Sequence, residues 1–82
     1  MKISYDPRYN IAYIQLRKKP AEVETIRISD ELNIDLSPDG KIYGIELFNA
    51  NEQLQLMEGG EFILTNESTQ KPVKLPITTE RV

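Results

Sequence analysis

The sequence predicts an α+β fold in which an antiparallel β-meander of four to five strands carries one short helix packed on one face. Three observations predict this fold. Short segments in which apolar and polar residues alternate recur along the chain, and turn-forming pairs such as Asp39-Gly40 separate them. Between residues 49 and 60 the apolar spacing changes to the helical period before a Gly-Gly pair ends it. We therefore expect a meander-plus-helix domain over residues 1–60, with residues 61–82 as an extended C-terminal arm of the same domain.

The composition is that of a globular protein without disulfides or thiolate sites. Hydrophobic residues make up 39% of the 82 residues and charged residues 28%, and cysteine is absent. No stretch approaches the roughly 20 apolar residues that span a bilayer, and the first residues lack the apolar core of a signal peptide. The net charge of −3 disfavours nucleic-acid binding but is compatible with a basic protein partner. We expect a cytoplasmic protein that binds neither nucleic acid nor membrane.

The first three strands follow from β-favouring residues between turns. Residues 2–6 alternate, and residues 10–16 are rich in isoleucine and tyrosine, so the two segments form a β-hairpin about a turn that begins with Asp-Pro. Residues 22–28 alternate charged side chains with valine, threonine and isoleucine. This pattern is typical of an exposed face or of a protected edge strand.

A second hairpin joins residues 32–36 to residues 42–48, and its side chains predict a register. With an even-length loop about Asp39-Gly40, three apolar side chains of each strand meet on one face, whereas an odd loop brings a carboxylate into that face. We therefore predict an even-length loop. The pairs that it forms are Leu32 with Leu47, Ile34 with Ile45, and Leu36 with Tyr43.

The opposite face of this hairpin carries two carboxylates, an asparagine and Gly44, so it is not a dry core. A glycine within a strand weakens a sheet unless another group packs closely above it, commonly an aromatic ring from a neighbouring strand. Tyr5 and Tyr13 are the candidates for that ring.

The C-terminal part combines a short helix with the extended arm. Apolar residues at the spacing i, i+4 and i+7 from Ala50 predict a helix of about two turns, which Gly59-Gly60 ends. Residues 61–65 form a further candidate strand. In residues 71–77 two prolines four positions apart exclude a helix and a central strand but suit an extended segment on a sheet edge.

The residue types that most enzymes use are largely missing. The chain has no histidine, cysteine or tryptophan, so we expect no enzymatic activity, no cofactor and no catalytic or metal-ligating residue. The carboxylate pair on neighbouring strands, Asp35 with Glu46 beside Gly44, is a candidate polar face, because such a pair can hold a divalent cation or a small ligand. The alternative is that both carboxylates are solvated or neutralised by a basic side chain, as is common on the wet face of an antiparallel sheet.

Apolar residues of the arm form the candidate interaction surface. The triplet at positions 62–64 points to both faces of a strand, so at least one side chain needs cover that a single helix does not provide. A protein partner, a homodimer in which the arms exchange, or the chain's own sheet would supply that cover. The candidate residues are Phe62, Ile63, Leu64, Val73, Leu75 and Ile77.

Several short segments resemble one family of small bacterial proteins. These segments are Tyr5-Asp6, Ala12-Tyr13-Ile14, Ile34-Asp35-Leu36, Asp39-Gly40-Lys41, Gly44-Ile45-Glu46-Leu47 and Asn49-Ala50. Over about residues 2–54 they resemble the domain-of-unknown-function family numbered twenty-two eighty-three, with Asn10 where an aspartate is common and an extension after Gly59. The resemblance implies small β-rich proteins without known enzymatic activity, some of them antitoxin-like partners of small toxins. It assigns no functional residue.

The sequence thus favours a non-catalytic protein-interaction module. Its sharper form is an antitoxin-like protein whose arm, residues 61–77, docks onto a small basic toxin. Two alternatives stay open: a small-ligand or divalent-metal-binding module that uses Asp35 and Glu46, and a homo-oligomeric structural protein.

Overall fold

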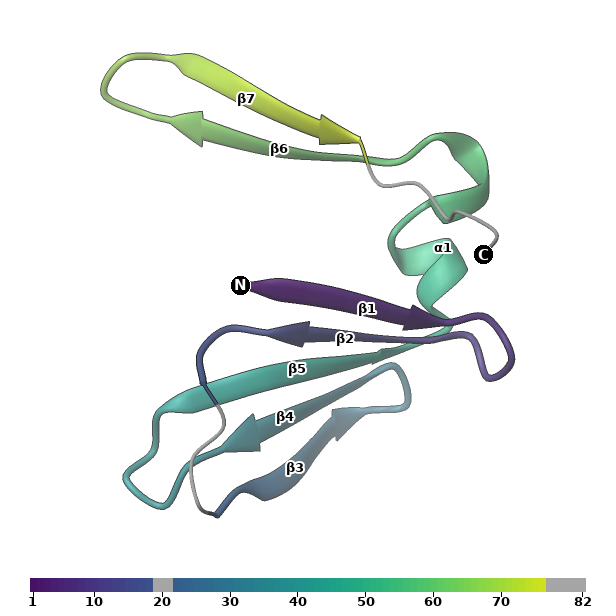
Figure 1. Cartoon of the computed structure of the whole chain (residues 1–82), viewed down its shortest axis with the longest axis vertical. Coiled ribbons are helices and arrows are strands. Elements are labelled where there is room, and N and C mark those ends of the chain that lie inside the picture. The colour runs from purple at the N-terminus through teal and green to yellow at the C-terminus, as the bar shows by residue number, and fades with distance from the viewer. Residues whose placement is uncertain (19–21, 77–82) are drawn as a thin grey trace. The chain divides into compact units, whose positions relative to one another are not determined.

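The computed structural model describes residues 1–18 and 22–76, and it confirms the predicted α+β class. The chain divides into two compact units, Met1–Ala50 and Asn51–Val82. The first unit contains a five-stranded antiparallel sheet and the second a two-stranded one, and a short helix connects them in sequence (Figure 1). No helix in these described ranges is long and apolar enough to cross a membrane.

The five-stranded sheet has the strand order β1-β2-β5-β4-β3. The hairpin β1-β2 and the meander β3-β4-β5 are therefore joined by antiparallel pairing of β2 with β5. Every residue of β3 is exposed, and β3 is an edge strand, as its alternating charges predict. The strands are β1 (Lys2–Asp6), β2 (Ile11–Gln15), β3 (Glu24–Ser29), β4 (Leu32–Leu36) and β5 (Ile42–Phe48).

Aliphatic rows on one face of this sheet supply its core. Cross-strand pairs align one isoleucine from each strand in a single row: Ile3, Ile14, Ile45, Ile34 and Ile26. The neighbouring row contains Ala12, Leu47 and Leu32. Ala12 is fully buried and Leu47 is 8% exposed. Apolar burial is therefore greatest at the centre of the sheet, where β2, β5 and β4 meet.

The loop between β4 and β5 has an odd number of residues, so the predicted even-length loop is wrong. The Ser37 backbone N donates to the Lys41 carbonyl at 2.9 Å, and the Gly40 N donates to the Ser37 carbonyl at 2.9 Å. These bonds close the loop over residues 38–40, with Gly40 at a φ of 86°. Such loops place a left-handed residue, usually glycine, at their last position.

A register shift compensates for the odd loop. Asp35 faces Gly44 but Leu36 faces Ile42, so Tyr43 has no residue of its own opposite on β4. Beyond this shift the predicted pairs Leu32 with Leu47 and Ile34 with Ile45 form, whereas the predicted pair of Leu36 with Tyr43 does not. The extra residue thus restores the alternation that an odd loop would otherwise invert.

The predicted two-turn helix is shorter than expected. It consists of one α-helical turn, α1 (Ala50–Gln53), and a separate 3₁₀ turn, η1 (Leu56–Glu58). Gln55 adopts a left-handed φ of 53° between them, which interrupts the helical hydrogen-bond pattern. Gly59, at a φ of 70°, ends the second turn as predicted.

The second sheet is a β-hairpin of two exposed strands, β6 (Glu61–Asn66) and β7 (Lys71–Pro76). Its pairing runs in unbroken antiparallel register from Glu61 opposite Pro76 to Asn66 opposite Lys71. The predicted strand and the predicted extended, proline-containing segment of the arm are therefore partners of each other. Ile77 and the residues after it lie outside the described ranges.

Candidate functional site

One face of the five-stranded sheet carries a hydrogen-bonded network centred on Asp35. The Tyr13 hydroxyl on β2 donates to Asp35 Oδ2 at 2.6 Å, and the Thr25 hydroxyl on β3 donates to Asp35 Oδ1 at 2.6 Å. Because β5 lies between β2 and β4, the Tyr13 side chain crosses β5 to reach this carboxylate. Both oxygens of Asp35, a residue of the candidate polar face, thus accept hydrogen bonds inside the sheet.

Gly44 provides the space for this crossing. It lies opposite Gln15 of β2 and Asp35 of β4, and a Cβ atom at this position would overlap the Tyr13 ring and hydroxyl. The predicted aromatic cover of Gly44 is therefore confirmed, and Tyr13 supplies it. The other candidate, Tyr5, instead donates to Asn10 Oδ1 at 3.3 Å.

Tyr43 lies beside this network. Its ring centroid is 6.2 Å from that of Tyr13, with the two ring planes tilted by 43°, and it is 8% exposed. The expectation that Tyr43 joins the aliphatic face is wrong. The register shift at Asp35 and Leu36 makes Tyr43 the extra residue of its strand, and its ring packs against another aromatic ring instead.

Glu46, the second predicted carboxylate, has a separate partner. Asn33 Nδ2 on β4 donates to Glu46 Oε1 at 3.1 Å. Asn33 Oδ1 is buried, and no hydrogen-bond partner for it is found among the residues that the structure describes. In the same part of the chain no group of three or more His, Cys, Asp or Glu side chains is arranged to hold a metal ion. The two carboxylates therefore take part in two different cross-strand contacts.

The surroundings of Tyr13 raise the pKa of its hydroxyl group. Burial, followed by the hydrogen bond to Asp35, raises the pKa of Tyr13 well above the ordinary tyrosine value of about 10. The folded protein therefore keeps this proton at a pH where the unfolded chain loses it. The stability that results is fully present below about pH 10 and is lost as the pH rises further.

We expect wild-type protein to lose stability more steeply above about pH 10 than Tyr13→Phe, which has no proton to keep at this position. Urea denaturation between neutral pH and about pH 11 measures the difference. Tyr9→Phe is the matched control, because Tyr9 is 67% exposed. Parallel pH profiles for wild type and Tyr13→Phe would show that the hydroxyl is not held in this network.

A second polar cluster joins three turns at one end of the sheet. Asn10 Nδ2 donates to Asn49 Oδ1 at 3.4 Å, and Asn49 Nδ2 donates to Glu31 Oε2 at 3.3 Å. The Ala50 backbone N also donates to the Asn10 carbonyl at 3.0 Å. Asn10 and Asn49 have left-handed φ values of 56° and 52°, which asparagine tolerates better than most residues. The local sequence pattern does not predict this cluster, whose only local signal is asparagine at two turn positions.

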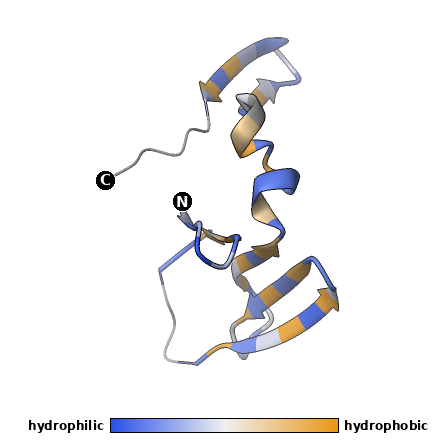
Figure 2. Cartoon of the chain, turned by 90° about the vertical axis from the view of Figure 1, so that its right-hand side faces the viewer, coloured by the Kyte–Doolittle hydropathy of each residue, from blue (hydrophilic) through white to orange (hydrophobic). Residues whose placement is uncertain are grey.

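The candidate interaction surface lies on the β6–β7 hairpin. Phe62 faces Leu75 and Leu64 faces Val73, so these four side chains share one face, which we call the hairpin stripe. Their exposed fractions range from 40% to 62%. Figure 2 shows hydrophobic and hydrophilic residues alternating along β7, whereas β6 has three consecutive hydrophobic residues at positions 62–64. Of the two remaining candidates, Ile63 faces Lys74 on the other side and Ile77 lies outside the described residues.

Comparison with known families decides the membership of the chain. The model of a family described as "Protein of unknown function (DUF2283)" matches residues 2–51, which is more than half of the chain. The chain belongs to this family. The matched residues of this DUF2283 protein contain the five strands of the first sheet and the whole network of Tyr13, Gly44 and Asp35, whereas the hairpin stripe lies outside the match. No curated protein and no solved structure matches the chain.

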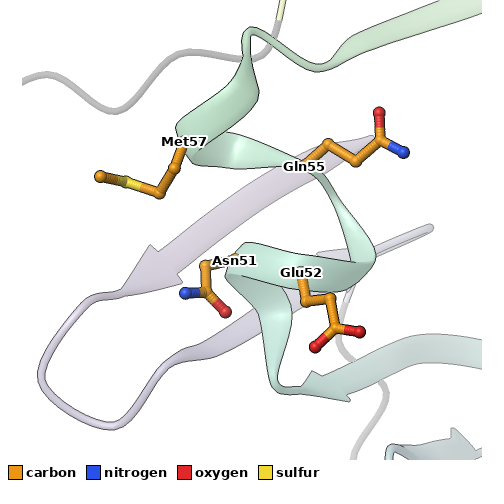
Figure 3. Close-up of a pocket in the computed structure, with 4 residues that line it drawn as sticks. All are labelled: Asn51, Glu52, Gln55 and Met57. Atoms are coloured by element: carbon orange, nitrogen blue, oxygen red, sulfur yellow. The ribbon is translucent and has the colours of Figure 1, made fainter.

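The DUF2283 protein also has a shallow pocket of about 280 Å³ in its second unit. Asn51, Glu52, Gln55 and Met57 line it (Figure 3). Figure 3 shows these four side chains pointing in different directions, and Met57 is 79% exposed. A ligand site needs polar groups that converge on one position, so this pocket does not have the arrangement of a binding site.

Proposed function

We propose that this DUF2283 protein is a non-catalytic protein-interaction module that binds a basic protein partner through the hairpin stripe. The observation that supports the proposal is the stripe itself, four largely exposed apolar side chains on one face of a hairpin. A two-stranded hairpin is marginally stable in water without further packing. A partner that covers the stripe buries apolar surface and stabilises the hairpin at the same time.

The charge of the chain supports a basic partner. The excess of acidic over basic residues gives a net charge of −3, which favours encounter with a positively charged protein. The finer form of the proposal is an antitoxin-like role in the cytoplasm, in which the partner is a small basic toxin. Its support is the resemblance to antitoxin-like proteins together with this charge.

We expect the double variant Phe62→Ser/Leu75→Ser to bind the partner at least tenfold more weakly than wild type. The two side chains face each other across the hairpin, so the change removes the apolar contact at one end of the stripe. Affinity purification with the tagged full-length chain as bait isolates the partner from native cells. The purified pair then gives Kd values for wild type and variant by calorimetry.

Ile28→Ser is the matched control, because Ile28 is a 58% exposed isoleucine of β3 and lies outside the stripe. It should leave the Kd unchanged. Equal Kd values for wild type and the stripe variant, or a partner with a net negative charge, would contradict the proposal. For the antitoxin-like form, the partner expressed alone should arrest growth, and co-expression of wild type but not of the stripe variant should restore it.

A further inference from the structure

The two edges of the β6–β7 hairpin differ in their hydrogen-bonding capacity. A proline has no backbone N–H, so a paired strand holds proline only where the nitrogen faces away from its partner. Pro72 and Pro76 are four positions apart on β7 and therefore both face its outer edge. Lys74, between them, is the one residue of residues 72–76 that offers an outward N–H on this edge. Proline thus restricts further pairing on the β7 side.

The outer edge of β6, in contrast, keeps its backbone N–H donors. Residues that face each other in an antiparallel pair orient their N–H groups alike, both toward the partner strand or both away from it. The partners of the outward positions on β7 are Glu61, Ile63 and Thr65, so these three residues present N–H and C=O groups at the outer edge of β6, which pairs with no other strand among the described residues. Residues 62–66 contain no proline and no charged residue, and β6 pairs with β7 without a register shift.

An exposed and regular strand edge of this kind is a template for pairing with another strand, and proteins normally block it or cover it. We propose that β6 pairs edge to edge, in antiparallel orientation, with β6 of a second copy of this chain. The product is a four-stranded sheet in the order β7-β6-β6-β7. Its two outer edges are both the proline-containing β7 strands, so the pairing ends in a closed twofold dimer and does not propagate.

Charge and orientation select the register of this pairing. Centred on Ile63, the pairing sets Glu61 opposite Thr65 of the second copy, and all three outward residues form hydrogen-bonded pairs. Phe62 then lies beside Leu64 of the second copy, which makes the two hairpin stripes continuous. A register centred on Glu61 would oppose two carboxylates, which is unfavourable.

The size of the interface sets the strength of the dimer. A stable dimer typically buries about 800 Å² per partner. One six-residue strand edge with its flanking side chains covers less than that. We therefore expect a Kd in the micromolar range, with monomer and dimer in exchange. This inference goes beyond the proposed partner binding, because it concerns the edge of β6 and not the stripe.

Sedimentation velocity on the full chain tests the proposal. From about 5 to about 500 μM, which brackets a micromolar Kd, the average mass should rise from 9.4 kDa toward twice that value. Ile63→Lys and Ile63→Glu should each remain monomeric, because each places two like charges opposite each other at the twofold axis. An equimolar mixture of the two variants should associate again. Ser68→Lys in the hairpin turn is the control of equal charge and should dimerise like wild type.

Amide hydrogen exchange identifies the edge. Protection of the Ile63 N–H should increase with protein concentration, whereas that of Lys74 on the opposite edge should not. A single 9.4 kDa species up to about 500 μM, a dimer that Ile63→Lys leaves intact, or protection that appears at Lys74 would overturn the proposal. Loss of dimerisation in Ile63→Lys with unchanged affinity for a basic partner would separate this inference from the proposed function.

Discussion

Gly44→Ala is expected to lower the free energy of unfolding by about 2–4 kcal/mol. Glycine normally weakens a strand, so this substitution would stabilise an ordinary strand position. Here the added Cβ would overlap the Tyr13 ring and hydroxyl. The ring must then leave the surface of β5, and Asp35 loses the hydrogen bond that it accepts at 2.6 Å. Overpacking and the lost charge-assisted hydrogen bond both contribute to the expected change.

A double-mutant cycle with Tyr13→Ala tests this explanation. Without the Tyr13 ring, Gly44→Ala should be neutral or stabilising, because the three atoms nearest to the added Cβ all belong to Tyr13. The coupling energy between the two positions should be about 2 kcal/mol or more, measured by urea denaturation of the four proteins. If Gly44→Ala costs the same with and without Tyr13, its effect arises from the backbone and not from the ring.

The cover over Gly44 was predictable because it follows from local alternation. A glycine in the middle of a strand requires a neighbouring group, and Tyr13 has the ring and the strand position to supply it. The full network was not predictable. Asp35 and Tyr13 meet only because β5 lies between β2 and β4, and this strand order arises from long-range pairing that the local pattern does not contain.

The loop between β4 and β5 shows a second limit of sequence reasoning. The alternation of apolar residues on the two strands predicted a loop with an even number of residues. A loop with an odd number of residues, together with one extra residue in a strand, places the same side chains on the same face. Tyr43 is that residue, and its ring finds its contact on Tyr13. The pattern therefore predicted the pairs Leu32 with Leu47 and Ile34 with Ile45, but it did not predict the loop length and the register shift that lead to them.

In the C-terminal part of the chain, too, some features were predictable from the sequence and others were not. The prolines of β7 predicted an extended strand at an edge, because they act through the backbone wherever they occur. The interruption of the helix at Gln55 has no comparable signal, since glutamine favours helices but adopts a left-handed φ of 53° here. Which apolar side chains of the arm share a face follows from the register of β6 with β7, and that register became known only with the structure.

Leu47→Ala is the second substitution with a large expected effect, a loss of about 2–4 kcal/mol in the free energy of unfolding. Leu47 is 8% exposed and lies between Ala12 and Leu32 in the central row of the sheet. Ala12 is fully buried and ends at its Cβ, so its side chain cannot extend into the space that a shortened residue 47 leaves. A cavity that neighbours cannot fill adds to the lost transfer free energy.

Ile28→Ala on β3 is the control for Leu47→Ala, because it also shortens an aliphatic side chain to alanine in the same sheet. Ile28 is 58% exposed, so we expect its substitution to cost less than about 1 kcal/mol. Chemical denaturation at neutral pH measures both variants against wild type. If the two substitutions cost the same, apolar burial would not be concentrated where β2, β5 and β4 meet. In that case the isoleucine row, which extends to both edge strands, would contribute as much to stability as the row of Leu47.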